Sequence, residues 1–293
     1  MKVFKNVLVF IFLFLNISSN AEEKLVFGIT VSENYAGDGN RIRKLASNMN
    51  NKMNIEYEKE FDAIFYDNQE LLLKDFKDKK NINAVVLYPA FYFDNKNLIK
   101  KISKNPFIYK TSTTSSSQLF LIANTNSKIN SISDIKNKTF MNTDFNDTYS
   151  TWLDYLTLKN LNNSYKKVIG NQLKSNKSST ALLDVYFNKA DFCVIEKETY
   201  VNMLILNPSL EKKLKVVEKS PEIFFSAITT IHKEATPELI TLINEILDKK
   251  TFKDDFKEFL KLINLDSALR VEFEDLKNFE DFYSEYRFLK GKE

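Results

Sequence analysis

The amino-acid sequence predicts an α/β protein of two lobes joined by two crossing strands, and three observations lead to this prediction. Strand-like and helix-like segments alternate from residue 24 to residue 102. They alternate again from about residue 120 to residue 222. Such alternation is typical of α/β units with a parallel sheet. Two long extended runs, at residues 107–125 and 221–231, separate the two series, so we expect each run to pass between the lobes.

The first 21 residues have the pattern of a secretory signal peptide. Lys2 and Lys5 precede the apolar run 7–15, and the small residues Ser19 and Ala21 stand three positions and one position before the expected cleavage point. A membrane-spanning helix needs about 20 apolar residues, which is longer than this run. We therefore expect residues 1–21 to be removed after Ala21 and the mature protein to be soluble and exported.

Composition excludes several common kinds of site. The single cysteine, Cys193, lies in an apolar run and has no partner for a disulfide, so we read it as a small buried hydrophobic residue. The single histidine, His232, would have to carry any His-based zinc site or Ser-His-Asp triad, and we do not expect it to be catalytic. Without Lys2 and Lys5 the formal net charge falls from +3 to +1, and this low charge does not indicate a nucleic-acid-binding protein. We expect no cofactor and no metal site.

The first series of elements begins after the leader. A polar loop follows its first strand and holds Tyr35 and Arg41, and its third strand ends at Tyr88. Ligands of open α/β sheets bind at the carboxyl ends of the strands, so these three residues are candidate ligand contacts. Tyr88 could equally be part of an aromatic core. We expect strands at 24–30, 55–66 and 82–89, and helices at 41–53, 67–80 and 90–102.

The second series begins with a short polar helix at 131–138 and a strand at 139–141. We expect further strands at 191–196 and 214–220, and helices that begin near Asp147 and at residues 178 and 198. After the second crossing run, Pro237 stands in the first turn of a helix, where its missing N–H group costs nothing. Residues 252–265 and 273–290 read as helical, and their Phe and Leu side chains should pack the C-terminal helices against the first lobe.

The loop that leads into the helix near Asp147 is the most informative stretch of the chain. A strand that feeds a hydroxyl-rich loop into a helix N-terminus can bind a small anion with backbone N–H groups and the positive end of the helix dipole. Thr148, Tyr149 and Ser150 supply these groups. The alternative is that Asp147 or Thr148 simply caps its own helix. Asp144 and Asp147 would also oppose an anion unless they point away.

Three stretches carry a family resemblance: SISDIKNKTF, ALLDVYFNKADFCVIEKETY and KVVEKSPEIFFSAITTIHKEATPELITLINEIL. They resemble segments of the periplasmic substrate-binding proteins of ABC transporters, in the phosphate-, phosphite- and phosphonate-binding (PhnD-like) branch of the type II fold. Asp191 stands at the position of the family's Asp in the second stretch. The family's Ser-Thr-Ser-Gly-like run corresponds to residues 147–151, where Thr151 replaces the Gly, and Asn137 replaces another family Gly.

The resemblance implies a two-lobed type II periplasmic-binding-protein fold, with two mixed sheets flanked by helices and joined by two crossing strands. Lobe 1 would comprise residues 22–118 plus 223–293, and lobe 2 residues 119–222. The implied protein is a periplasmic monomer without catalytic residues. It would capture a small polar ligand, an oxyanion such as phosphate, phosphite or a phosphonate, in the interlobe cleft and deliver it to a membrane ABC permease.

The resemblance also suggests how the candidate residues would share the ligand. Thr148, Tyr149 and Ser150 would hold its polar head. The contacts from the first lobe would come from Tyr35, Arg41 and Tyr88, and those from the second lobe from Asp191, Glu196 and Thr199.

Two other functions are compatible with the same sequence. One is a sensory module that passes its closed form to a membrane histidine kinase or chemoreceptor, and the sequence of the exported module does not distinguish it from a transport protein. The other is an enzyme of the type II fold. The leader, the lack of Cys and His clusters and the absence of a nucleophile motif count against an enzyme.

Overall fold

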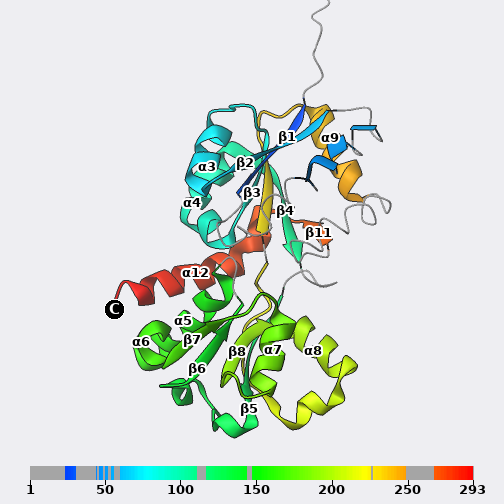
Figure 1. Cartoon of the computed structure of the whole chain (residues 1–293). Helices are drawn as coiled ribbons and strands as arrows, with labels where there is room; N and C mark the ends of the chain where they lie inside the picture. Colours follow the sequence, from blue (N-terminus) through cyan, green and yellow to red (C-terminus); the bar gives the residue numbers. More distant parts are fainter. Residues whose placement is uncertain are drawn as a thin grey trace, which may run out of the picture.

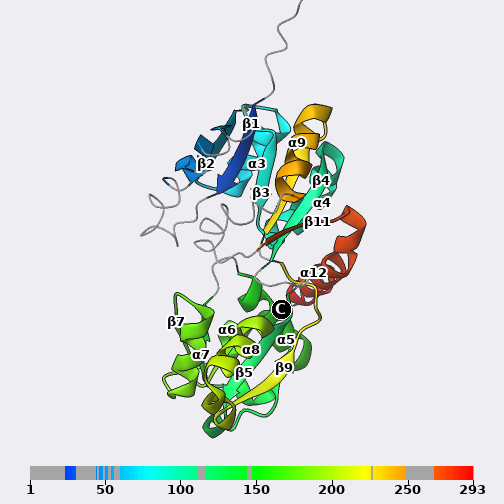
Figure 2. The ribbon, with the colours of Figure 1, turned by 90° about the vertical axis from the view of Figure 1, so that its right-hand side faces the viewer.

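The protein has two lobes, each built on its own β-sheet, with the C-terminal helix between them (Figure 1). The same separation is seen from the side (Figure 2). The computed structural model describes residues 24–30, 60–110, 117–143, 147–225, 227–248 and 267–292, together with single residues and short pieces between 44 and 55. The expected leader lies outside the described residues. Among the described helices, none combines the length and the apolar character that a membrane crossing requires.

The first sheet has six strands in the order β11-β4-β10-β3-β1-β2. Strands β1, β2 and β3 are mutually parallel, whereas β10 runs antiparallel to both β3 and β4, so the sheet is mixed. Its strands are β1 (Leu25–Thr30), β2 (Phe61–Tyr66), β3 (Ala84–Leu87), β4 (Ser103–Lys110), β10 (Ala227–His232) and β11 (Ser267–Arg270). Among the described residues, its helices include α3 (Gln69–Lys77), α4 (Pro89–Ile102) and α9 (Pro237–Asp248).

Local sequence signals explain where the helices of this lobe begin. The Asn68 side chain accepts a hydrogen bond of 2.9 Å from the Leu71 N–H group and so caps α3. Pro89 stands at the first position of α4, where a missing N–H group costs nothing, and the preceding Tyr88 is extended. The buried Leu72 and Phe76 of α3 lie in the core with residues of the sheet.

The second sheet has five strands in the order β7-β6-β8-β5-β9. Strand β6 is parallel to β7 and β8, and β5 is antiparallel to β8 and β9. The strands are β5 (Leu119–Asn124), β6 (Thr139–Asn142), β7 (Asn171–Lys174), β8 (Phe192–Glu196) and β9 (Leu214–Lys219). The α-helices are α5 (Thr148–Leu161), α6 (Tyr165–Val168), α7 (Ser178–Tyr186) and α8 (Lys197–Leu206), and the 3₁₀ helices are η2 (Thr125–Ser127), η3 (Ile132–Ile135) and η4 (Pro208–Lys212).

The two extended runs cross between the lobes, as the sequence predicts. The first run contributes β4 to the first sheet and β5 to the second, and the second run leads from β9 back to β10. Ser117 and Phe224 pair where the runs pass each other. The Ser117 N–H group donates to the Phe224 carbonyl at 2.7 Å, and the Phe224 N–H group donates to the Ser117 carbonyl at 3.2 Å. The two crossings are therefore joined to each other.

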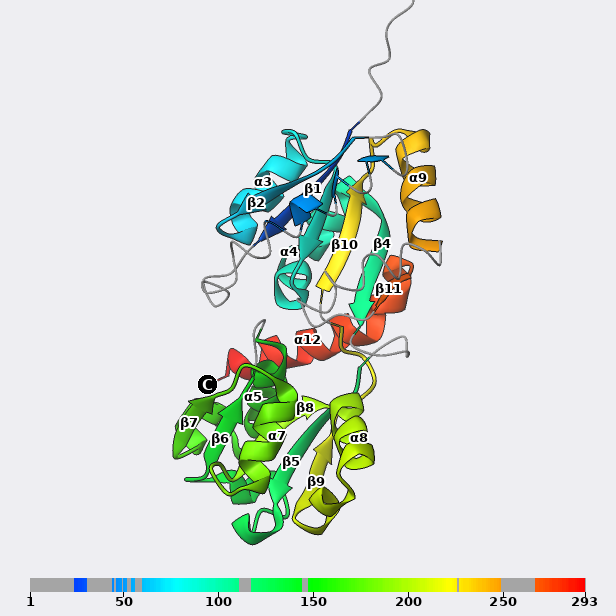
Figure 3. The same cartoon turned by 45° about the vertical axis from the view of Figure 1, so that its right-hand side comes forward.

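The C-terminal helix contacts both lobes, which extends one prediction. After the 3₁₀ helix η5 (Phe273–Leu276), helix α12 (Lys277–Lys290) contacts α4 of the first lobe and also α5 of the second (Figure 3). The predicted packing against the first lobe is confirmed, and α12 packs against the second lobe as well. The reason is that α12 carries apolar side chains on more than one side: Tyr283 packs on Phe93 of α4, and Phe282 packs on Tyr155 of α5.

Other differences lie in short or polar segments. The strand predicted at 55–66 is a strand only from Phe61, and residues 54 and 55 are helical. Strands β7 and β11 and helix α6 were not predicted. Cys193 is buried as expected, and the buried His232 packs edge-on against Phe76. The first sheet draws its strands from residues 25–110 and 227–270 and the second from residues 119–219. The lobe boundaries themselves stay a prediction.

Candidate functional site

The strand directions turn the carboxyl ends of both sheets toward the space between the lobes. In the first sheet β4 runs toward the crossing, and β10 is antiparallel to both β4 and β3, so β3 and its parallel neighbour β1 end on the same side. In the second sheet Leu119, the first residue of β5 after the crossing, lies opposite Glu196, the last residue of β8. Strand β6 is parallel to β8 and ends at the same edge. Ligands of α/β sheets bind at such edges.

Two helices begin side by side at this edge of the second sheet. Strand β6 leads through residues 143–147 into α5, and β8 leads directly into α8. The Tyr149 hydroxyl of α5 donates a hydrogen bond to the Glu196 carboxylate at the end of β8. Thr199, in the first turn of α8, donates to the other carboxylate oxygen of Glu196 at 3.4 Å. Three predicted site residues are thus brought together.

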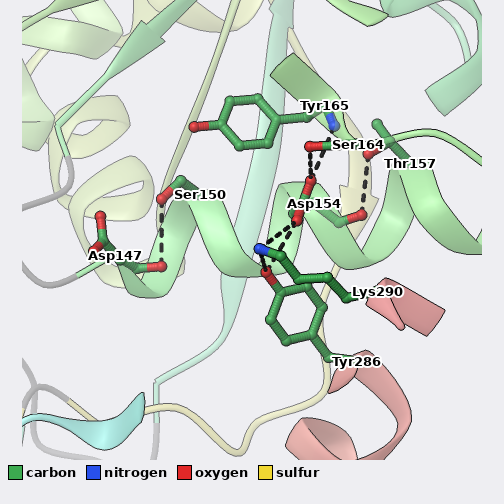
Figure 4. A network of polar contacts seen from close by, with 8 residues as sticks. All are labelled: Asp147, Ser150, Asp154, Thr157, Ser164, Tyr165, Tyr286 and Lys290. Carbon is green, nitrogen blue, oxygen red and sulfur yellow. Dashed lines mark hydrogen bonds and ion pairs between the residues drawn. The ribbon is translucent and has the colours of Figure 1, made fainter. Parts of the chain in front are cut away.

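The start of α5 argues against one alternative from the sequence. Asp147 occupies the N-cap position in the left-handed region, with φ 61° and ψ 10°, and its side chain makes no capping hydrogen bond to the helix. Its carbonyl instead accepts from the Thr151 N–H group at 2.8 Å and from the Ser150 hydroxyl at 3.3 Å (Figure 4). The interpretation of Asp147 as an ordinary helix cap is therefore wrong.

Thr143 adds a buried hydroxyl that sequence reasoning missed. It follows β6 directly and is 3% exposed, and its Oγ1 has no hydrogen-bond partner among the residues that the structure describes. A buried hydroxyl without a partner costs about 1–3 kcal/mol, so such a group calls for an explanation. The only sequence feature that could have pointed to Thr143 as a site residue was its position directly after the strand. Its burial without a partner depends on packing, which a sequence pattern does not contain.

Glu196 is the acidic member of this group. Only 7% of the residue is exposed, although it stands at the end of a strand and at the start of α8. Both of its carboxylate oxygens accept hydrogen bonds from hydroxyl groups, those of Tyr149 and Thr199. Thr148 and Ser150 flank Tyr149 and are buried as well. The site therefore combines hydroxyl groups with one buried carboxyl group.

Asp191 does not belong to this group. It precedes β8, at the opposite end of the strand from Glu196, and its carboxylate accepts from the Thr139 N–H group at 2.8 Å. Its own N–H group donates to the Thr139 carbonyl at 3.0 Å. Five residues of strand separate it from α8, which at about 3.3 Å per residue is too far for a shared small ligand. Asp191 instead joins the start of β6 to β8.

In the first lobe Tyr88 lies at the corresponding carboxyl edge. It follows β3, its hydroxyl donates to the Thr30 carbonyl at the end of β1 at 3.3 Å, and its N–H group donates to Gln69 Oε1 at 3.0 Å. Tyr35, Arg41 and Asp144 lie outside the described residues. Within the part of the chain that the structure describes, no three His, Cys, Asp or Glu side chains are grouped so that they could hold a metal ion.

Comparisons with known proteins agree with this arrangement. Residues 100–276 match the model of a family described as ABC transporter, phosphonate, periplasmic substrate-binding protein. A comparison with curated protein sequences found no match.

Solved structures resemble the chain over most of its length. A binding protein component of an ABC phosphonate transporter from Pseudomonas aeruginosa has a TM-score of 0.60 at 16% identity, covering 92% of this chain and 90% of that chain. PhnD1 from Prochlorococcus marinus, in complex with methylphosphonate, has a TM-score of 0.58 at 15% identity, covering 90% and 98%. The periplasmic aliphatic sulphonate binding protein SsuA from Escherichia coli has a TM-score of 0.51 at 12% identity, covering 91% and 88%. At these identities the likeness shows the two-lobed fold.

Proposed function

Because this chain belongs to the periplasmic phosphonate-binding family of ABC transporter substrate-binding proteins, we propose that it captures a small oxyanion at the start of α5. Proteins of this family bind a small molecule and work with a membrane permease, and they are not enzymes. Phosphate, phosphite and organic phosphonates are the ligands that we propose. The mature protein would begin after Ala21 in the periplasm and act there as a monomer without chemistry of its own.

The observation that carries the proposal is a helix start at which the Asp147 side chain makes no capping hydrogen bond, next to the buried hydroxyl of Thr143. The first turn of α5 is the positive end of a 14-residue helix, and its N-cap side chain does not bond to it. Thr143 Oγ1 is buried at the end of the strand that leads into this turn. A bound oxyanion would accept hydrogen bonds from both, which would offset the cost of burying an unpaired hydroxyl.

Glu196 would influence which oxyanions can bind at this site. An ionised carboxylate only accepts hydrogen bonds, so the part of the ligand that approaches Glu196 has to donate one. A protonated phosphonate or phosphate oxygen, or an amino group on an organic phosphonate, meets this condition. A fully ionised oxyanion is repelled. Glu196 would thus select among oxyanions while α5 holds their negative charge.

Tyr88 supports a ligand shared between the lobes. It stands at the edge of the first sheet that faces the second lobe, and its hydroxyl donates to the Thr30 carbonyl at that edge. Tyr35 and Arg41 remain candidates for the same side of the ligand. Closing the lobes around the ligand would bury it and give the permease a face to recognise.

A thermal-shift screen of the mature protein tests the ligand class. We would measure the melting temperature with phosphate, phosphite, methylphosphonate, an alkyl sulfonate, amino acids and polyamines. A ligand that binds only the folded state adds about 2.7 kcal/mol of stability at a hundred times its Kd. We expect stabilisation by a phosphorus oxyanion, and stabilisation by polyamines alone would overturn the proposal.

Calorimetry on variants tests the site. We expect the double change of Thr148→Ala and Ser150→Ala to weaken binding of the stabilising oxyanion at least tenfold. Thr157→Ala is the control, because Thr157 lies in the same helix about two turns farther on and is equally buried. Unaltered affinity in the double variant would contradict this site assignment.

Mass spectrometry of the exported protein tests whether the mature chain begins at Glu22.

A further inference from the structure

Helix α12 is attached to the first lobe by a carboxylate that is almost completely buried. Glu280 is 9% exposed, and one of its oxygens accepts from the Tyr92 hydroxyl of α4 at 2.8 Å. The same oxygen lies 2.7 Å from Lys100 Nζ, and the other oxygen lies 3.5 Å from Lys96 Nζ. Tyr92 is itself fully buried. Hydrogen bonds to a charged group are stronger than those between neutral groups, so this is a strong attachment.

A second buried carboxylate attaches the same helix to the second lobe. Asp154 of α5 is 3% exposed and accepts from the Tyr286 hydroxyl of α12 at 2.9 Å, with Lys290 Nζ at 3.5 Å (Figure 4). Asp154 also accepts from the Ser164 hydroxyl at 2.6 Å and from the Tyr165 N–H group at 3.0 Å, which join α5 to the start of α6. One carboxylate thus ties α12 to two helices of the second lobe.

Aromatic rings fix α12 to the crossing segment between these two attachments. Phe282 packs edge-on against Phe224 of the second crossing at 5.1 Å and against Tyr155 of α5 at 5.0 Å. Phe279 packs on Phe225 at 4.6 Å. Figure 3 shows α12 running across the junction of the lobes. A rotation of one lobe against the other therefore has to carry α12 with it or break one of its attachments.

We propose that α12 is a brace that sets the angle between the two lobes, and that Tyr286 is a positioning residue for the ligand site on α5. Asp154 lies six residues beyond Thr148, which corresponds to about 9 Å along the helix. The contact with Tyr286 therefore orients the first turn of α5 relative to Tyr88 in the first lobe. The brace is a property of the chain without ligand. Its effect on affinity rests on the proposed function.

The distance between the lobes tests the brace directly. We would place spin labels at Lys77→Cys in the first lobe and Lys212→Cys in the second, both exposed positions, and measure their distance distribution by electron-electron double resonance. Cys193 is fully buried and burial raises the pKa of its thiol, so it does not compete for the label. The variants are Tyr286→Phe, which removes only a hydroxyl, and the control Arg287→Gln.

Arg287 is a matched control because it is the neighbouring residue and also contacts a carboxylate on another helix, that of Asp94 in α4, yet the pair is 42% and 47% exposed. Exposed pairs of this kind contribute little. We expect Tyr286→Phe to change the ratio of the described arrangement to other lobe angles by about tenfold, since it loses a hydrogen bond to a carboxylate. The distribution should then shift or broaden by several Å, and Arg287→Gln should leave it unchanged.

Each result decides a separate question. A Tyr286→Phe distribution identical to that of the unmodified chain, measured well below the melting temperature, would overturn the brace. A changed distribution together with a severalfold change in the Kd of methylphosphonate would support both the brace and its link to the site. A changed distribution in a protein that binds no phosphorus oxyanion would support the brace and overturn the proposed function.

Discussion

Replacing Thr143 by Val should make the protein more stable and a weaker binder at the same time. Val has nearly the shape of Thr but no hydroxyl, and Thr143 Oγ1 is buried without a partner among the described residues. An unsatisfied buried hydroxyl costs about 1–3 kcal/mol. We therefore expect the free energy of unfolding without ligand to rise by about 1 kcal/mol. For a protein of this size that is about 2–4 °C in the melting temperature.

Thr157→Val is the matched control on the neighbouring helix. Thr157 is equally buried, but its hydroxyl donates to the Asp154 carbonyl at 3.0 Å. Losing a satisfied hydrogen bond costs about 0.5–1.5 kcal/mol, so this variant should be less stable. The two substitutions are chemically identical, and the structure predicts that they change the free energy of unfolding in opposite directions.

The affinity for the ligand should also differ between the two variants. A hydrogen bond from Thr143 to a charged oxyanion is worth about 1.5–3 kcal/mol, so Thr143→Val should weaken methylphosphonate binding at least tenfold in isothermal titration calorimetry. Thr157→Val should leave the Kd unchanged. The reasoning is refuted if Thr143→Val is destabilised to the same extent as Thr157→Val and binds with unaltered affinity.

Three further predictions follow from single contacts. Burial on its own would raise the pKa of Glu280, but hydrogen bonds from Lys100 and Tyr92 outweigh it and leave the pKa lowered. Its stabilisation is therefore present above the ordinary pKa of 4.5 and lost as the pH falls through the folded value, so Glu280→Gln should flatten the acid side of a plot of melting temperature against pH. Asp281→Asn, in an exposed pair on the same helix, should not do so. Asp147→Asn removes a negative charge from the start of α5, and Asn tolerates the positive φ of this position. Two charges about 8 Å apart at an effective dielectric constant of about 40 repel each other by about 1 kcal/mol. Methylphosphonate should therefore bind about fivefold more tightly to this variant at low salt. Unchanged affinity would mean that Asp147 points away from the ligand. Gly170→Ala would place a Cβ 2.6 Å from the backbone oxygen of Asn137 and should cost about 2 kcal/mol in urea unfolding, and a neutral result would contradict the packing described at this turn.

The sequence was sufficient for the two-lobed fold because its signals are local and strong. Residues 192–196 form an apolar strand that runs directly into a helix, so the place of Glu196 at a carboxyl edge could be predicted from the sequence. The same holds for the strand that leads toward Asp147. The crossings were recognisable because both are long extended runs between series of alternating elements. These features depend on period and order alone.

Other features depend on packing, which the sequence does not reveal. Strand β7 is the polar segment NQLK at a sheet edge, so no apolar run marks it. The periodicity of α12 shows that Phe282 and Tyr286 lie on apolar faces, but not that those faces meet α5 as well as the first lobe. Asp191 matched a motif position, but a motif does not reveal at which end of a strand a residue lies. In the structure Asp191 precedes β8, at the end away from Glu196. Thr143 was identified only because its buried hydroxyl has no partner in the part of the chain that the structure describes.

The central claim is that an oxyanion binds at the first turn of α5, and backbone amide NMR of the mature protein tests it most directly. In a titration with methylphosphonate we expect the largest amide shifts at residues 143 and 148–150, because the N–H groups of the first turn and the Thr143 hydroxyl would contact the ligand. Smaller shifts should follow at Glu196 and Tyr88. Saturable shifts that are largest elsewhere, with residues 148–150 unmoved, would contradict the claim.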